Sequence, residues 1–310
     1  MTDTATAAGP MTVAVTGASG LIGRHVVNRL LREGHAVRRL VRGPARAEDE
    51  VSWDPRAGTV DADGLAGVDA VVHLAGENIA GRWTDEKKQR ILRSREDGTR
   101  AITEAMAALS PRPRVLVMSA GSGIYGDRGD EVVDETAAPG SGFLAEVGQR
   151  WEAAAAPAEA AGIRVVKLRL GVVLSRQGGA LEKLLPPFRM GVGGKVGSGT
   201  QWMPWIAIGD AVDLFVRALA DERMRGPVNA VAGSSRNADF AEALGRAVHR
   251  PAVLPAPAFA LRLAFGEMAE ETLLGGQRVD PRVLRELGHE FRHPDLDSAL
   301  RAALADDLPS

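Results

Sequence analysis

The feature that most constrains the fold is a glycine-rich turn between an apolar segment and an amphipathic one. Met11–Thr16 is apolar and β-branched, which is typical of a buried parallel strand. Leu21–Glu33 carries apolar residues at helical spacing. The turn between them has glycine at Gly17, Gly20 and Gly23. Glycine permits a positive φ and a close approach of a pyrophosphate, and a helix N-terminus offers free N–H groups. The turn therefore predicts a dinucleotide-binding site.

Strands and helices continue to alternate along the first half of the chain. Apolar strands are predicted at Ala36–Val41, Ala70–Leu74, Arg114–Ser119 and Arg164–Leu170. Helices are predicted at Thr84–Leu109 and Gly142–Ala161. This alternation favours an α/β fold with a Rossmann-type, doubly wound parallel sheet and right-handed crossovers.

The pattern changes after Leu174. Arg176–Thr200 is rich in glycine and is followed by Gln201–Trp205, and together they read as a long loop that carries two of the five tryptophans. Long ordered loops are often functional, so the tryptophans Trp202 and Trp205 either cover a substrate or pack in the core. Further helices are predicted at Gly209–Ala220, Ala238–Val248, Ala258–Leu274 and Pro294–Leu304. They indicate a smaller, mainly helical C-terminal lobe.

These patterns divide the chain into three parts. Residues 1–10 form a Thr/Ala-rich tail without the apolar centre of a secretion signal, and we expect it to be disordered. Residues 11–175 form the dinucleotide-binding Rossmann domain. Residues 176–310 form a substrate-binding lobe, with some segments returning to the Rossmann sheet.

Composition excludes several classes of function. The 310 residues carry a formal net charge of −2, which gives no general attraction to nucleic acid or to an anionic membrane. The absence of cysteine excludes disulfides, thiolate zinc sites and cysteine nucleophiles, and the histidines have no ligand spacing, so no metal is expected. No apolar run reaches the roughly 18 residues of a membrane span. We expect a cytoplasmic monomer or homodimer that binds a small-molecule substrate.

The second predicted strand indicates which dinucleotide is bound. An NAD site usually ends this strand with an acidic residue that binds the ribose 2′-OH. Arg42 stands there instead, and an arginine suits the 2′-phosphate of NADP(H). Arg24, Arg39 and Arg46 are near in sequence and could assist, although all of these arginines could equally be solvated.

The expected cofactor contacts gather at the carboxyl ends of the strands, where doubly wound sheets bind ligands. On the glycine turn they are Thr16, Gly17, Ser19, Gly20, Leu21, Ile22 and Gly23. Elsewhere they are Arg42, Leu74, Ala75, Gly76, Glu77, Ser119 and Leu170.

Many ordered segments resemble one family. They include His73–Ile79, Arg82–Trp83, Ser94–Arg95, Ile124–Gly126, Phe143–Glu146, Trp151–Glu152, Arg169–Leu174, Gly178–Leu181, Pro186–Phe188, Gly197–Trp202 and Gly226–Ala230. Through them Met11–Leu304 resembles the extended short-chain dehydrogenase/reductase superfamily. The match is closest to its atypical, NAD(P)-dependent epimerase/dehydratase-like branch, which ends in a short C-terminal domain of unknown function. The resemblance implies the fold and the cofactor, while the substrate and reaction of that branch are largely undefined.

The superfamily's usual catalytic pair is absent. The resemblance implies a Tyr-x-x-x-Lys sequence on the helix after the fifth strand, in which tyrosine is the acid/base and lysine lowers its pKa. Phe143 stands at the approximate tyrosine position and Val147 at the lysine position. Tyr125 is the only tyrosine in the chain, and Gly129 stands four residues after it.

Four residues remain as candidates for catalysis. Ser119 or Ser122 would supply the hydroxyl, although either serine could instead stabilise a turn. Tyr125 would line the substrate pocket, or would cap the core with its hydroxyl hydrogen-bonded. Glu146 lies one turn after Phe143 and would face the same cleft, unless it is simply solvated.

Two functions fit these residues. The first is an NADP(H)-dependent oxidoreductase or epimerase that acts on a small carbonyl, hydroxyl or sugar-nucleotide-like substrate, with a proton donor other than the usual tyrosine. The second is a non-catalytic NADP(H)-binding redox sensor or partner-binding protein. The missing pair motivates the second hypothesis directly.

Overall fold

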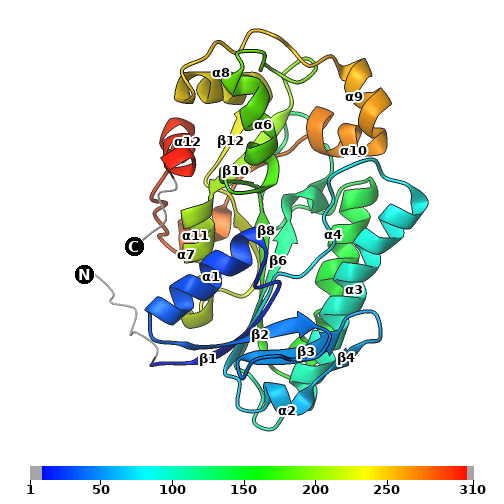
Figure 1. The fold of residues 1–310 in the computed structure, drawn as a ribbon, viewed down its shortest axis with the longest axis vertical. Helices are drawn as coiled ribbons and strands as arrows, with labels where there is room; N and C mark the ends of the chain where they lie inside the picture. Colours follow the sequence, from blue (N-terminus) through cyan, green and yellow to red (C-terminus); the bar gives the residue numbers. More distant parts are fainter. Residues whose placement is uncertain (1–8, 306–310) are drawn as a thin grey trace.

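A computed structural model describes residues 9–305 and contains a large, mostly parallel sheet between two layers of helices (Figure 1). The sheet order is β11-β8-β6-β5-β1-β2-β3-β4, and only the β3–β4 pair is antiparallel. Its strands are β1 (Thr12–Thr16), β2 (Ala36–Arg42), β3 (Glu50–Asp54), β4 (Thr59–Val60), β5 (Ala70–His73), β6 (Val115–Gly121), β8 (Arg164–Leu170) and β11 (Gly226–Ala230). The predicted Rossmann-type fold is confirmed.

Alternate residues of the central strands pack into two separate hydrophobic cores, one on each face of the sheet. Val13 and Val15 of β1 pack with α1 (Leu21–Arg32) and α7 (Ile208–Ala220) on one face. Ala14 packs with the helices of the other face, which are α3 (Asp85–Ala108), α4 (Phe143–Ala153) and α5 (Ala156–Ala160). Because both faces are covered, these strands read as continuous apolar runs.

The upper part of the molecule in Figure 1 has its own small sheet and core. Strand β10 (Trp202–Ala207) lies between β9 (Val172–Leu174) and β12 (Gly233–Arg236). The surrounding helices are α6 (Gly179–Arg189), α8 (Asn237–Ala247), α9 (Ala258–Phe265), α10 (Glu267–Ala269), the π-helical turn Glu270–Leu274 and α12 (Leu296–Ala305). The remaining elements are α2 (Ala62–Leu65), the 3₁₀ turn Ser122–Tyr125, β7 (Val132–Val133), β13 (Arg278–Val279) and α11 (Arg282–Glu286).

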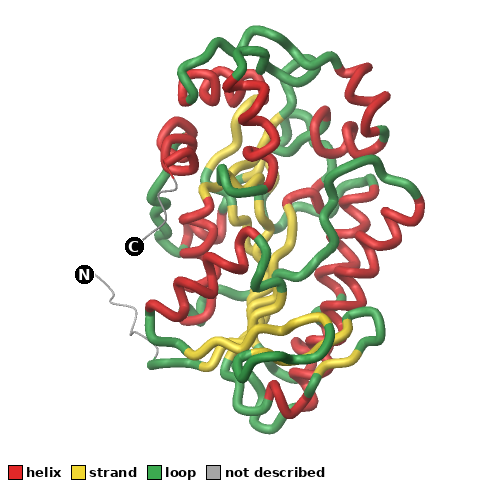
Figure 2. The backbone as a smooth tube through the Cα atoms, in the orientation of Figure 1, coloured by secondary structure: helices red, strands yellow, loops and turns green. Residues whose placement is uncertain are grey.

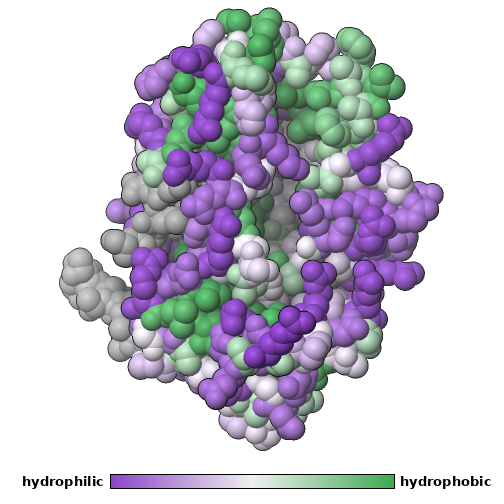
Figure 3. Space-filling view, viewed as in Figure 1, coloured by the Kyte–Doolittle hydropathy of each residue, from purple (hydrophilic) through white to green (hydrophobic). Residues whose placement is uncertain are grey.

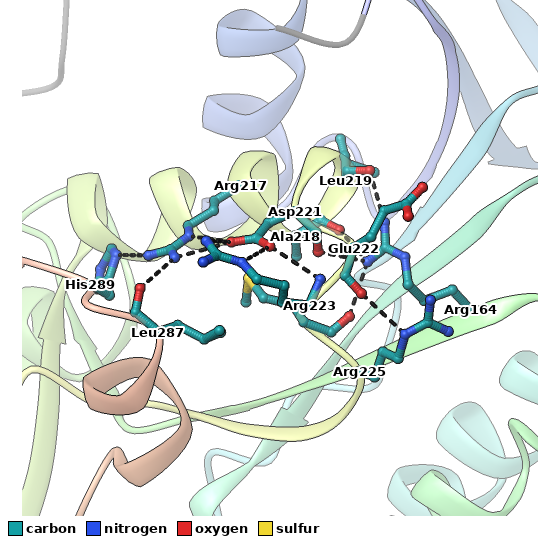
Figure 4. A network of polar contacts seen from close by, with 11 residues as sticks. Arg164, Arg217, Ala218, Leu219, Asp221, Glu222, Arg223, Arg225, Leu287 and His289 are labelled. Atoms are coloured by element: carbon teal, nitrogen blue, oxygen red, sulfur yellow. Dashed lines mark hydrogen bonds and ion pairs between the residues drawn. The ribbon is translucent and has the colours of Figure 1, made fainter. Parts of the chain in front are cut away.

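The chain returns to the large sheet after it has entered the upper part. Helix α7 packs on α1, and β11 adds to the sheet beside β8 (Figure 2). At the end of α7 the Arg164 guanidinium donates to four backbone carbonyls, those of Ala218, Leu219, Asp221 and Met224 (Figure 4). These bonds satisfy orphan carbonyls at a helix C-terminus and tie α7 to the start of β8.

Three predicted elements differ from those observed. The segment 176–205, predicted as a loop, contains α6 and the first residues of β10. The predicted helix 258–274 breaks at Gly266, whose φ is 59°. The predicted helix 142–161 is divided after Ala153 into α4 and α5. Most of the predicted tail, residues 1–8, lies outside the described residues. Within residues 9–305, none of the helices combines the length and apolarity needed to cross a bilayer.

Candidate functional site

The glycine turn after β1 requires glycine for steric reasons. Gly17 has φ +66°, and a Cβ on it would lie 2.9 Å from the carbonyl carbon of Leu74. A Cβ on Gly23 would lie 2.1 Å from the carbonyl oxygen of Gly17. These close contacts hold the first turn of α1 directly against the end of β1, as a pyrophosphate cradle requires.

The N-terminus of α1 has no side-chain cap. Gly20 is the N-cap residue, and the first turn contains no acidic side chain. The predicted contacts Ser19, Leu21 and Ile22 lie on this turn, and Leu21 packs beside Gly178 of the segment that leads into α6. The free N–H groups and the positive helix end suit an anion, so the residues present fit a dinucleotide diphosphate.

A buried hydrogen-bond chain fixes the adjacent strand ends. Thr16 Oγ1 lies 2.8 Å from Nδ1 of His73 and accepts the backbone N–H groups of Leu74 and Ala75. The Nε2 atom of His73 lies 3.1 Å from Thr99 Oγ1. Complete burial lowers the pKa of His73 to about 4, so the imidazole is neutral at pH 7. Thr16 therefore positions the turn that follows β5.

That turn, residues 74–77, is held by α3. Ser94 Oγ accepts the backbone N–H of Glu77, and Arg95 Nη1 donates to the Glu77 carbonyl at 3.0 Å. The Lys87 ammonium donates to the Glu77 carboxylate at 2.7 Å, and this bond lowers the pKa of Glu77. The predicted contacts Leu74, Ala75, Gly76 and Glu77 thus form a rigid ledge beside the glycine turn.

The arginines near the end of β2 have different partners. Arg39 makes a two-pronged ion pair with Asp49, and Arg24 donates to the Gln177 side chain. Arg42 is exposed, and within residues 9–305 no hydrogen bond or ion pair joins its guanidinium to another side chain. Arg42 is therefore available to an anion at the carboxyl end of β2.

The predicted residues of β6 and β8 reach the same edge of the sheet. Ser119 is buried at the end of β6, and its hydroxyl lies 3.4 Å from the His73 carbonyl. Ser122 is buried in the turn that follows. Leu170 ends β8 opposite Gly121. The edge therefore brings together the predicted residues of β1, β2, β5, β6 and β8.

Tyr125 does not reach this edge with a free hydroxyl. Its side chain is fully buried, its hydroxyl donates to Asn229 Oδ1 at 2.7 Å, and the Arg169 guanidinium donates to it at 2.9 Å. Burial raises the pKa of the Tyr125 phenol. Arg169 is fixed in turn by a two-pronged ion pair with Glu152. This geometry is that of a core residue, and it argues against Tyr125 as a proton donor.

Glu146 also lies away from the cleft. Its side chain is exposed and pairs with Arg150 on the same helix. Phe143 and Val147 are buried in a cluster with Trp83 and Met268, so they face α3 and the C-terminal region. The next position, Leu144, contacts Gly123 beyond β6.

One turn later on α4 no side chain fits. A Cβ on Gly148 would lie 2.8 Å from the Cβ of Ile124. The α4 positions that face the end of β6 are therefore 144 and 148, one residue beyond the predicted pair. Neither the pair of positions 143 and 147 nor the pair 144 and 148 contains a tyrosine or a lysine.

Sequence reasoning missed a carboxylate at the start of α4. Glu271 accepts the backbone N–H groups of Phe143 and Leu144, both at 2.7 Å. The N-cap residue itself, Gly142, has φ 103° and no side chain to cap the helix. The glycine before the helix was the available signal, but nothing in the sequence indicated a partner 128 residues away.

Trp202 and Trp205 have different environments. Trp205 is buried in the upper core and donates to Ser235. Trp202 is half-buried, and its ring contacts the guanidinium groups of Arg236 and Arg278, whose Cζ atoms lie 4.2 and 4.7 Å from its centroid. Its indole N–H donates to Asp130. Core packing therefore accounts for Trp205, and Trp202 remains partly accessible.

Comparison with known proteins gives the family. A model described as the NAD dependent epimerase/dehydratase family matches residues 13–231. A second, described as a domain of unknown function (DUF1731), matches residues 256–303. The chain belongs to the NAD-dependent epimerase/dehydratase family. This confirms the resemblance seen in the sequence, including the C-terminal domain of unknown function.

Relatives in this family match the chain along almost its whole length. Epimerase family protein Mb2239 of Mycobacterium bovis is 42% identical over 290 residues, which cover 93% of this chain and 96% of the relative. The crystal structure of human epimerase family protein SDR39U1 with NADPH has a TM-score of 0.87 at 35% identity, covering 96% and 100% of the two chains. A nucleoside-diphosphate sugar epimerase of Corynebacterium glutamicum has a TM-score of 0.78 at 37% identity, covering 95% of this chain and 58% of the other.

A metal centre finds no support in the described residues. Between residues 9 and 305, no three His, Asp or Glu side chains lie together in an arrangement that could hold an ion. In this member of the epimerase/dehydratase family, the polar groups at the sheet edge are instead hydroxyls, backbone N–H groups and arginines.

Proposed function

We propose that this chain binds NADP(H) along the carboxyl edge of its large sheet. The observation that carries the proposal is the uncapped N-terminus of α1 beside glycines that tolerate no Cβ. The crystallised human relative, which contains NADPH, supports the same assignment. Residues 11–175 would hold most of the cofactor, and residues 176–310 would complete the cleft for a small-molecule substrate.

The phosphate on the adenosine ribose would bind Arg42. This side chain extends from the end of β2, next to the β1 turn, and has no competing carboxylate partner. A guanidinium presents several N–H donors in one plane, which suits a phosphate. The same guanidinium gives no advantage to NAD, which carries a hydroxyl at this position.

The experiment for this step is a comparison of affinities. Arg42→Asp should weaken NADPH binding at least tenfold and bring the NADPH/NADH affinity ratio toward one, because a carboxylate repels the phosphate and accepts from a hydroxyl. Arg114→Asp is the control, since Arg114 is exposed just before β6, at the opposite edge of the sheet, and this variant should leave the ratio unchanged. An unchanged ratio in Arg42→Asp would exclude the proposed role.

As a reaction we propose oxidoreduction or epimerisation of a small carbonyl, hydroxyl or sugar-nucleotide-like substrate. When bound, the cofactor supplies or accepts the hydride. The chain's own residues orient the substrate and move the proton at the end of β6, where Ser119 and Ser122 provide the hydroxyls. The proposal predicts that some carbonyl compound or sugar nucleotide causes oxidation of NADPH. This oxidation is measured as a decrease in NADPH absorbance.

The packing of α4 favours a second candidate, a non-catalytic NADP(H)-dependent sensor or partner-binding protein. Phe143 and Val147 are enclosed by Trp83 and Met268, and Tyr125 is committed to the core. This candidate predicts tight NADPH binding without turnover, and a protein partner retained with NADP⁺ or NADPH but not with both. A substrate that oxidises NADPH would exclude it.

A further inference from the structure

Arg95 of α3 lies against the ledge formed by residues 74–77. The Cζ atom of its guanidinium would be 3.3 Å from a Cβ placed on Gly76, and Nη2 would be 3.5 Å away. On its other side the guanidinium covers the ring of Trp151, 4.9 Å from the centroid. The charged group thus contacts both the turn after β5 and helix α4, at the carboxyl edge of the sheet.

The Arg95 guanidinium has more N–H donors than there are hydrogen-bond acceptors around it. Nη1 donates to the carbonyls of Glu77 and Ile91, whereas Nε and Nη2 have no hydrogen-bond partner among residues 9–305. Neither atom is among the polar atoms sealed off from solvent without a partner, although the neighbouring Trp151 Nε1 is. Two N–H-bearing atoms of Arg95 therefore stay reachable, and an acceptor-rich ligand would satisfy them.

The surrounding charge is positive. The Glu77 carboxylate lies 2.7 Å from the Lys87 ammonium and 3.7 Å from the Arg90 guanidinium, so Lys87, Arg90 and Arg95 share one acidic neighbour. Burial lowers the pKa of Arg95 to about 10, which leaves it charged at neutral pH. A half-buried cation without a carboxylate partner of its own is costly unless a ligand compensates it.

The strand order shows which half of a dinucleotide lies nearest. In the sheet, β1 lies between β2, which carries Arg42, and β5, which leads into the ledge. A diphosphate at the β1 turn sends one half of the cofactor toward β2 and the other toward β5 and β6. Arg95 lies on the β5 side, facing α4, while Arg42 lies on the opposite side.

We propose that Arg95 binds the nicotinamide-side half of NADP(H), donating Nε–H and Nη2–H to its ribose or diphosphate oxygens. It thereby supplies the positive charge that Val147 and Gly148 cannot supply from α4. This inference rests on the proposed NADP(H) binding and adds a residue to that same site.

The experiment compares a whole cofactor with its adenosine half. Arg95→Gln should weaken NADPH binding at least tenfold and change the affinity for adenosine 2′,5′-bisphosphate less than twofold, measured by calorimetry on the full chain. Arg42→Asp should weaken both ligands. Arg95→Lys, which keeps the charge, should recover part of the NADPH affinity and also reports the effect if Arg95→Gln folds poorly.

The matched control is Arg93→Gln. It removes a positive charge from an exposed position of the same helix, two residues before Arg95, so it should bind NADPH within about twofold of the wild type. Equal weakening of both ligands in Arg95→Gln, or wild-type NADPH affinity, would overturn the assignment to Arg95. Failure of the wild type to bind NADPH would instead overturn the proposed function.

Discussion

At the scale of single residues, His73 shows how a buried polar group fixes the ends of neighbouring strands. Its imidazole contacts the hydroxyls of Thr16 and Thr99 and no carboxylate. Protonation would add a charge at a fully buried position, and one hydroxyl would lose its acceptor. Burial therefore holds the pKa of His73 near 4, compared with about 6.5 in an unfolded chain.

This difference makes stability depend on pH in a predictable direction. As the pH falls from 6.5 toward 4, the unfolded chain takes up a proton at His73 that the folded chain does not, so stability is lost on acidification. Between pH 7 and pH 5, the wild type should lose about 2 kcal/mol more unfolding free energy than His73→Asn. Urea unfolding measures both curves. They should run parallel between pH 7 and pH 8, and parallel curves at pH 5 as well would contradict the prediction.

Local sequence rules predicted the geometry of the glycine turn better than the environment of Tyr125. Gly17, Gly23 and Arg42 follow local rules of turn geometry and strand position, and these rules do not depend on distant contacts. The environment of Tyr125 depends on Arg169 and Asn229, which lie 44 and 104 residues away. A lone tyrosine beside a turn gives no local sign of such partners.

At the scale of elements, α4 depends on a distant carboxylate. Gly142 cannot cap the helix with a side chain, so Glu271 accepts the N–H groups of Phe143 and Leu144 from the far end of the sequence. Lys88, on α3, pairs with Glu267 of the same C-terminal segment. The C-terminal domain of unknown function therefore packs directly against α3 and α4.

Removing this cap should destabilise the fold measurably. Glu271→Ala leaves two N–H groups of α4 without their acceptor and should lower the unfolding free energy by about 1–3 kcal/mol. Glu270→Ala is the control from the same turn, since its exposed pair with Arg262 should contribute less than about 1 kcal/mol. Denaturant unfolding distinguishes them, and equal losses in the two variants would refute the capping role.

The sequence predicted element boundaries wrongly where packing against distant segments decides them. Helix α6 contains Pro186 and Pro187, and the glycines around it indicated a loop. Its formation follows from burial of Leu181, Leu185 and Phe188 in the upper core. The strands β1, β5 and β6 were predicted well because buried parallel strands are mostly apolar along their length.

At the scale of the whole molecule, the proposed cofactor edge belongs to the large sheet, and the upper part of the molecule lies beyond it (Figure 1). Figure 3 shows this face hollowed near its centre, between the upper part and the large sheet. The ledge, the glycine turn and Arg42 come from separate strands that only the folded sheet brings together. The unfolded chain therefore offers no cofactor site, and a bound cofactor must stabilise the folded state.

This linkage gives a test that separates the residues of the site from those of the scaffold. NADPH at about 100 times its dissociation constant should add about 2.7 kcal/mol to the wild-type unfolding free energy, and NADH at the same concentration should add less. Glu271→Ala starts from a lower stability, but it should gain the same increment from NADPH, because its carboxylate is bonded to α4. Arg95→Gln should gain a smaller increment, because this substitution weakens the complex with NADPH. Denaturant unfolding with and without NADPH measures the three increments. If Glu271→Ala lost this increment and Arg95→Gln kept it, Glu271 rather than Arg95 would be the residue that binds the cofactor.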